Sequence, residues 1–283
     1  MQDNSGNLDR EIAEGKFLWN FTSAKSLAKT AGTTTVLLTG KGEPTLFPDE
    51  ITAILRHLRN KQTGEPEFPI VELQTNALKI GQAIRSDLSA KIFSDLALWR
   101  KLGLSTIAIS VVSTEDEENA QVYTKDYPSL IKTVEMLHWY GFTVRIGLML
   151  LKPFVSTPER LKGVIDWCKT QGVAQLTVRP IRKPEESQDE SVSQYVRDCG
   201  VDSQQEKDIV GYIRENGKLL LELSHGATIY DVHGQNVCLT DCLTQPNRMD
   251  QIRTLIYYPK SGRLAYDWQY QGAVIFSGRT TEE

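Results

Sequence analysis

The first residues whose types and spacing could do chemistry form a short turn after an apolar run. Residues 36–39 are followed by Gly40-Lys41-Gly42-Glu43-Pro44. Glycine lets a ligand approach the backbone closely, and proline fixes a turn and removes a backbone donor. A carboxylate at the end of a strand can accept hydrogen bonds from an ammonium group. The turn therefore indicates a site for a small zwitterion, and the alternative is that Glu43 only caps the helix expected to begin near Pro48.

Cysteines are the second set of candidates, and the chain has four: Cys168, Cys199, Cys238 and Cys242. The polar, acidic N-terminal segment is not a signal peptide, so free thiols or metal ligands are favoured over disulfides. Cys238 and Cys242 form a CxxxC pair, with Cys199, His225 and His233 as further donors. This spacing is looser than the CxxC of structural zinc sites, so thiols without a metal are the default expectation. Cys168 is expected to pack in the core from a helix face.

The elements that must position these residues are alternating strands and helices. Apolar runs predict strands over residues 35–39, 70–74, 106–112, 143–150 and 175–180. Helical spacing of apolar residues predicts helices over 49–60, 86–102, 127–140 and 157–171. Strands recur every ~32–37 residues, the size of one βα unit. The pattern predicts an α/β fold with a partial TIM-like (βα) barrel, whose functional residues lie at the C-terminal ends of the strands.

The composition changes after Pro180. Residues 181–194 are charged and polar and are expected to form a loop or linker. A helix is predicted over 202–216, a strand over 219–223 and a β-meander over 254–276, with a hairpin turn at 259–262. We therefore expect two parts: a barrel over residues 1–183 and a small α+β extension over residues 184–283.

Length and charge exclude some functions. The chain has 283 residues and a net charge of −4, so nucleic-acid binding has no electrostatic support from the overall composition. No apolar run approaches the ~20 residues of a membrane helix. Without a signal peptide or a membrane segment, we expect a cytoplasmic protein with no membrane partner.

The stretch "LLTGKGEPTLFPDEI", followed by "VELQTNAL", resembles the core of the radical S-adenosylmethionine (radical SAM) enzyme superfamily. The resemblance covers about residues 21–181. It implies that S-adenosylmethionine binds at the barrel mouth, with Gly42, Glu43 and Pro44 holding the amino group of its methionine half. GEP alone would be a weak signal; its combination with five strand–helix units and a later Thr-Asn pair is more specific.

Four further residues match family positions. Thr75 and Asn76 match the Thr-Asn pair after the next strand, and Ser110 matches a position that contacts the ribose or the carboxylate. Arg179 lies on the strand whose backbone passes the adenine. Each residue also has a simpler interpretation: Asn76 as a turn residue, Ser110 as a buried hydroxyl bonded to the backbone, and Arg179 as a partner for a nearby acid.

The intact family reaction uses a [4Fe–4S] cluster and an external reductant to form a 5′-deoxyadenosyl radical, which takes a hydrogen from a substrate. The cluster is held by three cysteines, usually spaced CxxxCxxC, and no cysteine precedes Val36. We favour the interpretation that the chain begins just past the cluster loop. The alternative is a cluster-free, non-catalytic barrel that binds S-adenosylmethionine or a nucleotide as a partner or regulator. A barrel lyase or aldolase, with Lys41 as its only obvious lysine, is a third interpretation. The sequence assigns no catalytic side chain, no metal ligand and no substrate.

Overall fold

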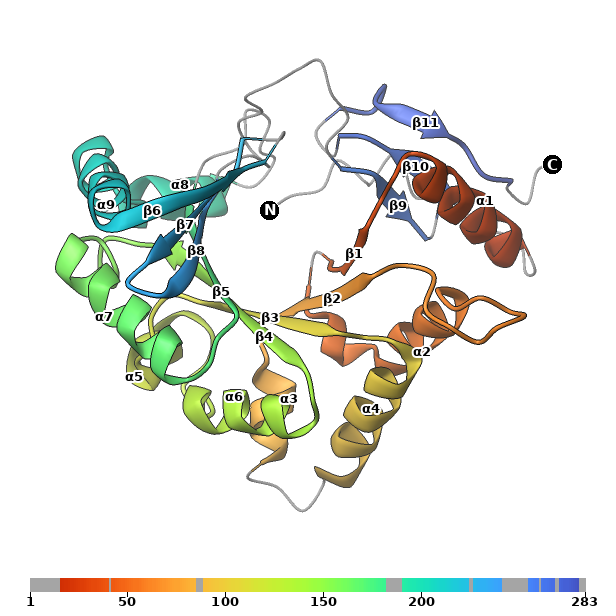
Figure 1. The fold of residues 1–283 in the computed structure, drawn as a ribbon, viewed down its shortest axis with the longest axis horizontal. Helices are drawn as coiled ribbons and strands as arrows, with labels where there is room; N and C mark the ends of the chain where they lie inside the picture. The colour runs from red at the N-terminus through yellow and green to blue at the C-terminus, as the bar shows by residue number, and fades with distance from the viewer. Residues whose placement is uncertain are drawn as a thin grey trace.

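The computed structural model describes residues 16–40, 42–84, 89–181, 190–223, 226–240, 254–259, 261–267 and 270–279. Within them the main body is an eight-stranded sheet in the order β1-β2-β3-β4-β5-β8-β7-β6 (Figure 1). Its first five strands are β1 (Thr35–Leu38), β2 (Ile70–Thr75), β3 (Thr106–Val111), β4 (Thr143–Leu150) and β5 (Gln175–Pro180). Each is parallel to the next. The five predicted strands are therefore confirmed, with ends that shift by one residue at most.

Helices follow these strands and lie along one side of the sheet (Figure 1). They are α2 (Pro48–His57), α3 (Leu78–Ala83), α4 (Ser89–Leu102), α5 (Asp116–Val122), α6 (Leu130–Trp139) and α7 (Pro158–Thr170). Their starts follow local chemistry: Pro48 occupies the first turn of α2, and the side chains of Ser129 and Thr157 cap α6 and α7. The short helices α3 and α5 were not predicted.

The two faces of the sheet differ in burial. On β4, Val144, Ile146 and Leu148 are completely buried, while Arg145 and Gly147, which alternate with them, are only half-buried. Side chains alternate between the faces of a strand, so one face packs under the helices and the other stays accessible. A parallel sheet with helices on one side and two separate end strands, β1 and β6, is the partial TIM-like barrel that the sequence predicts.

The sheet continues past residue 183. Two helices, α8 (Glu190–Cys199) and α9 (Ser203–Asn216), lead into β6 (Gly217–Glu222), β7 (Thr228–Val232) and β8 (Gln235–Leu239). Strand β8 is parallel to β5, whereas β7 is antiparallel to both β8 and β6. The loop prediction for residues 181–194 is wrong from Glu190 onward, where α8 begins. The same sheet spans both sides of position 183, and the division there into two parts stays a prediction.

A three-stranded antiparallel sheet near the C-terminus confirms the predicted meander. It consists of β9 (Ile256–Tyr258), β10 (Arg263–Ala265) and β11 (Val274–Phe276). It lies beside α1 (Lys16–Thr30), as Figure 1 shows. The fully buried Asn20 of α1 donates its amide to the carbonyl of Arg279 and accepts from the Arg279 N–H, at 3.1 and 2.8 Å. These two bonds tie the first described helix to the last described residue.

Candidate functional site

Glu43 lies just past the C-terminal end of β1, and its carboxylate reaches across to the end of β2. Its Oε1 accepts from the Thr45 N–H at 2.9 Å, the Thr45 hydroxyl at 2.7 Å and the Thr75 hydroxyl at 2.6 Å. Its Oε2 accepts from the backbone N–H of Asn76 at 2.8 Å. The interpretation of Glu43 as a cap is correct in part, because the carboxylate caps the 3-10 turn Pro44–Leu46 rather than α2.

The end of β2 is shaped to meet this carboxylate. The buried Thr75 hydroxyl donates to Glu43 and accepts from the Ala77 N–H at 2.8 Å. Ala77 has a φ of +56°, a left-handed conformation that turns the chain sharply into α3. Asn76 accepts from the Leu78 N–H at 3.0 Å through its side-chain oxygen. Asn76 therefore acts as a turn residue, and its backbone N–H also contacts Glu43.

The two carboxylate oxygens of Glu43 are occupied unequally. Among the described residues Oε1 has three donors and Oε2 has one. Each carboxylate oxygen offers about two lone-pair sites, so Oε2 retains room for a further donor. Gly42 beside it is exposed, and no atom lies within 4 Å of the position that a Cβ would take. The turn therefore presents a fixed negative charge next to open space.

Tyr123 is a member of this region that the sequence analysis missed. It follows α5, and its hydroxyl donates to the Ser110 carbonyl at 2.9 Å. Burial raises the pKa of Tyr123, and the nearby charge of Glu43 raises it further, so the phenol stays protonated and acts as a donor. Its ring stacks on Tyr127, with centroids 5.9 Å apart. A tyrosine so far along the chain from the strand end carries no local signal that would have singled it out.

The strand register aligns the remaining predicted residues on the accessible face of the sheet. Ser110 is level with Gly147, which is level with Thr177. Arg179 lies two residues further along β5, on the same face, and is half-buried. Arg179 has an interaction partner of its own within the chain. The structure thus places Ser110 and Arg179 on neighbouring strands at the same edge as Glu43 and Thr75.

Below this level the accessible face carries a polar network. Arg145 of β4 donates to the Glu72 carboxylate of β2 at 2.6 Å, and it also contacts Gln175 of β5. Gln175 in turn donates to Asn236 of β8 at 2.7 Å. Because Glu72 is almost fully buried, the pair with Arg145 compensates a charge that would otherwise be costly. This network makes the interior face of the partial barrel polar beneath the candidate site.

The described residues contain no set of metal ligands. No group of three or more His, Cys, Asp or Glu side chains within them could hold a metal ion. Cys168 is buried on α7, as predicted, and burial raises the pKa of its thiol. Cys238 is buried on β8 and Cys199 lies at the end of α8, whereas Cys242 and His225 fall outside the described residues. The donors present in the described part of the chain do not fit a [4Fe–4S] cluster.

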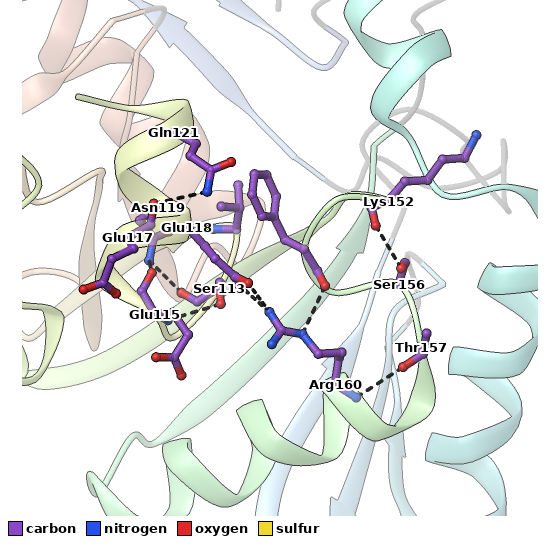
Figure 2. A network of polar contacts seen from close by, with 12 residues as sticks. Ser113, Glu115, Glu117, Glu118, Asn119, Gln121, Lys152, Ser156, Thr157 and Arg160 are labelled. Carbon is purple, nitrogen blue, oxygen red and sulfur yellow. Dashed lines mark hydrogen bonds and ion pairs between the residues drawn. The ribbon is translucent and has the colours of Figure 1, made fainter. Parts of the chain in front are cut away.

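A second hollow lies on the helix side, between the loop after β3 and helix α7. Its volume is about 300 Å³, and its lining includes Ser113, Glu115, Arg160, Gly163 and Trp167. Figure 2 shows the polar contacts at one end of it, where Arg160 binds the Glu118 carboxylate. Its lining shares no residue with the Glu43 site. Within the described part of the chain, no helix is long and apolar enough to cross a bilayer.

The fold and the site define a partial (βα) barrel with a fixed carboxylate at the C-terminal edge of its strands. No protein-family profile matches the chain, and no curated protein matches it. Solved structures of similar fold include a radical SAM methyltransferase from Sphaerobacter thermophilus, at 14% identity and a TM-score of 0.46, covering 70% of this chain and 53% of that one. Streptococcus suis SuiB bound to S-adenosylmethionine matches at 16% identity and a TM-score of 0.43, covering 73% of this chain and 40% of that one. SuiB bound to its precursor peptide SuiA matches at 17% identity and a TM-score of 0.41, covering 73% and 46%.

These matches name the family that the sequence resembles, and they concern the fold alone. The chain spans about 40–53% of the length of the solved chains that it matches. What the chain binds is therefore argued below from its own residues.

Proposed function

We propose that the chain binds S-adenosylmethionine at the C-terminal edge of the sheet, with Glu43 accepting a hydrogen bond from the ammonium group of the methionine half. The observation that carries this proposal is the unequal use of the Glu43 carboxylate. Three donors fix Oε1, and Oε2 has only the Asn76 N–H at 2.8 Å among the described residues. A carboxylate that is already held in place loses little conformational entropy when the ammonium group binds.

The other residues of the edge would bind and orient the rest of the ligand. Gly42 leaves the space beside the carboxylate open. Ser110 would contact the ribose or the ligand carboxylate, and the backbone of β5 at Arg179 would pass the adenine. Both roles come from the family resemblance, and the position of these residues at the same strand edge is compatible with them.

Radical generation needs a further group. A [4Fe–4S] cluster, when bound, would supply the electron that cleaves the sulfur–carbon bond of S-adenosylmethionine. The described residues do not fit such a cluster, so we propose this reaction only for a form of the protein that also carries one. Such a form would need a reductant, and its substrate is a small or larger molecule of unassigned class.

The second candidate is a cluster-free barrel that binds S-adenosylmethionine or a nucleotide without cleaving it. The missing ligand set among the described residues favours this candidate. Anaerobic reconstitution with iron and sulfide, followed by reduction in the presence of S-adenosylmethionine, separates the two. Formation of 5′-deoxyadenosine supports the enzyme, whereas ligand binding without iron retention or cleavage supports the binder.

Titration calorimetry tests the proposed binding residue directly. S-adenosylmethionine and 5′-methylthioadenosine share the nucleoside, but only the first has an amino group. Glu43→Gln should weaken binding of S-adenosylmethionine by about 10- to 100-fold, because a hydrogen bond to a charged group contributes about 1.5–3 kcal/mol. The same substitution should leave the affinity for 5′-methylthioadenosine nearly unchanged.

Glu50→Gln is the matched control, because Glu50 is an exposed acid on the first turn of α2. It should leave both affinities at the wild-type values. An equal loss for both ligands in Glu43→Gln would show that the substitution disturbs the site as a whole. No binding of either ligand to the wild-type chain would refute the proposal.

A further inference from the structure

Strand β6 carries three successive leucines that are open to solvent. Leu219, Leu220 and Leu221 expose 46%, 51% and 51% of their surface. Side chains alternate along a strand, so consecutive exposed leucines mean that neither face of β6 is covered along this stretch. Apolar side chains grouped in this way on a surface mark an interaction site more often than scattered ones do.

The position of β6 in the sheet leaves one of its edges without a partner strand. β6 is the last strand in the sheet order and pairs only with β7 in the described part of the chain (Figure 1). The register between them shifts between Leu219 and Leu221, so the ladder is irregular at Leu220. Such irregularities hinder long edge-to-edge pairing of backbones. A contact at this strand is therefore expected to rely on the leucine side chains.

Two opposite charges flank the leucines. Lys218 precedes them and Glu222 follows them, and both side chains are exposed. Neither forms an ion pair within the described residues, although Asp231 of β7 is level with Lys218. Asp231 instead accepts from the backbone N–H of Gly234 at 2.6 Å. The sequence Lys-Leu-Leu-Leu-Glu thus presents an apolar centre with one charge of each sign at its ends.

We propose that β6 is an interface between two copies of this chain. A two-fold axis through Leu220 makes the two β6 strands antiparallel, as in an isologous dimer. Leu219 then faces Leu221 of the partner subunit, and Lys218 faces Glu222 of the partner subunit. Each copy provides both halves of the match, so the strand is complementary to its own reverse. This charge complementarity favours a second copy over an unrelated partner.

The contact is small, which sets the expected strength. Three half-exposed leucines on each side cover much less than the ~1,200 Å² of a stable interface, so the dissociation constant should be about 10–100 µM. Sedimentation velocity over a range of protein concentrations measures this equilibrium. Leu220→Lys should place two like charges on the axis and leave the chain monomeric. Ile131→Lys is the control, because Ile131 on α6 is 42% exposed and should keep the wild-type equilibrium.

Charge reversal tests the antiparallel register. Lys218→Glu and Glu222→Lys should each raise the dissociation constant at least about tenfold, because like charges then face each other across the axis. A one-to-one mixture of the two variants restores both pairs and should associate at least as well as the wild type. The double variant Lys218→Glu/Glu222→Lys should also dimerise again. Circular dichroism and thermal unfolding confirm that each variant folds.

Two results would overturn the proposal. One is a wild-type chain that stays monomeric throughout the concentration range. The other is a mixture of the two single variants that associates no better than either variant alone. Neither result depends on the binding of S-adenosylmethionine, so the two proposals fail independently.

Discussion

Glu43 Oε1 lies 2.6 Å from the hydroxyl of Thr75, although the two residues are 32 positions apart. The bond joins the turn after β1 to the end of β2 and holds the carboxylate toward the accessible face of the sheet. Thr75 is 3% exposed, so this bond forms away from water, where an unmet polar group is costly.

Thr75→Val should lower both stability and ligand affinity. It removes the donor to Glu43 and leaves the Ala77 N–H, which now bonds to the hydroxyl at 2.8 Å, without its acceptor. We expect a loss of about 1–3 kcal/mol in the free energy of unfolding. Thr75→Ser keeps the hydroxyl and should lose less on both measures. Urea unfolding and calorimetry with S-adenosylmethionine measure the two effects, and equal values for the Val and Ser variants would contradict this role.

Asn119→Ala should destabilise the turn between β3 and α5. The fully buried amide of Asn119 donates to the carbonyls of Ser113 and Glu115 and accepts from the Val112 N–H, at 2.8–3.1 Å (Figure 2). Its removal leaves buried backbone groups unpaired, so about 2–3 kcal/mol of stability should be lost. The exposed Gln121 on the same helix provides the control, since Gln121→Ala should change stability by less than about 0.5 kcal/mol. Equal losses in thermal or urea unfolding would refute this account.

The stability should depend on pH through Glu67. Burial raises the pKa of Glu67, but hydrogen bonds from Lys25 and Lys29 outweigh it and hold the pKa below its ordinary value of 4.5. The unfolded chain therefore binds this proton more readily, so the stabilisation is complete above the unfolded pKa and is lost as the pH falls through the folded pKa.

The difference in unfolding free energy between the wild type and Glu67→Gln should accordingly be constant at neutral pH and shrink as the pH falls below about 4.5. Urea unfolding at a series of pH values measures it. Glu65→Gln, at an exposed neighbouring position, is the control. A difference that grows toward acid pH would reverse the assigned sign.

Two helical glycines should respond oppositely to alanine. At Gly163 in α7 no atom lies within 4 Å of the added Cβ, so Gly163→Ala should stabilise the chain by up to about 1 kcal/mol through helix propensity. At Gly81 in α3 the Cβ would lie 2.5 Å from Cγ of Pro128 and 2.7 Å from the Thr133 hydroxyl. Gly81→Ala should therefore destabilise it. Thermal unfolding compares the two, and a shared sign would show that the packing around Gly81 relaxes.

The sequence by itself determined the parts that depend on local chemistry. Apolar runs gave the five parallel strands, and cap residues such as Ser129 and Thr157 marked the helix starts within one residue. Because parallel strands end at the same edge, the sequence also placed Glu43 and Thr75 together. It missed β7 and β8, whose residues include polar ones such as Asp231, Gln235 and Asn236 and form no continuous apolar run.

Only the tertiary structure decided which partners these residues meet. The sequence could not show that Tyr123 turns back to the Ser110 carbonyl, or that β8 rather than β6 pairs with β5. Leu219–Leu221 look like part of a buried strand, yet they are exposed because β6 ends the sheet order. The reason is physical: a residue's type sets which contacts suit it, whereas long-range packing sets which contacts it makes.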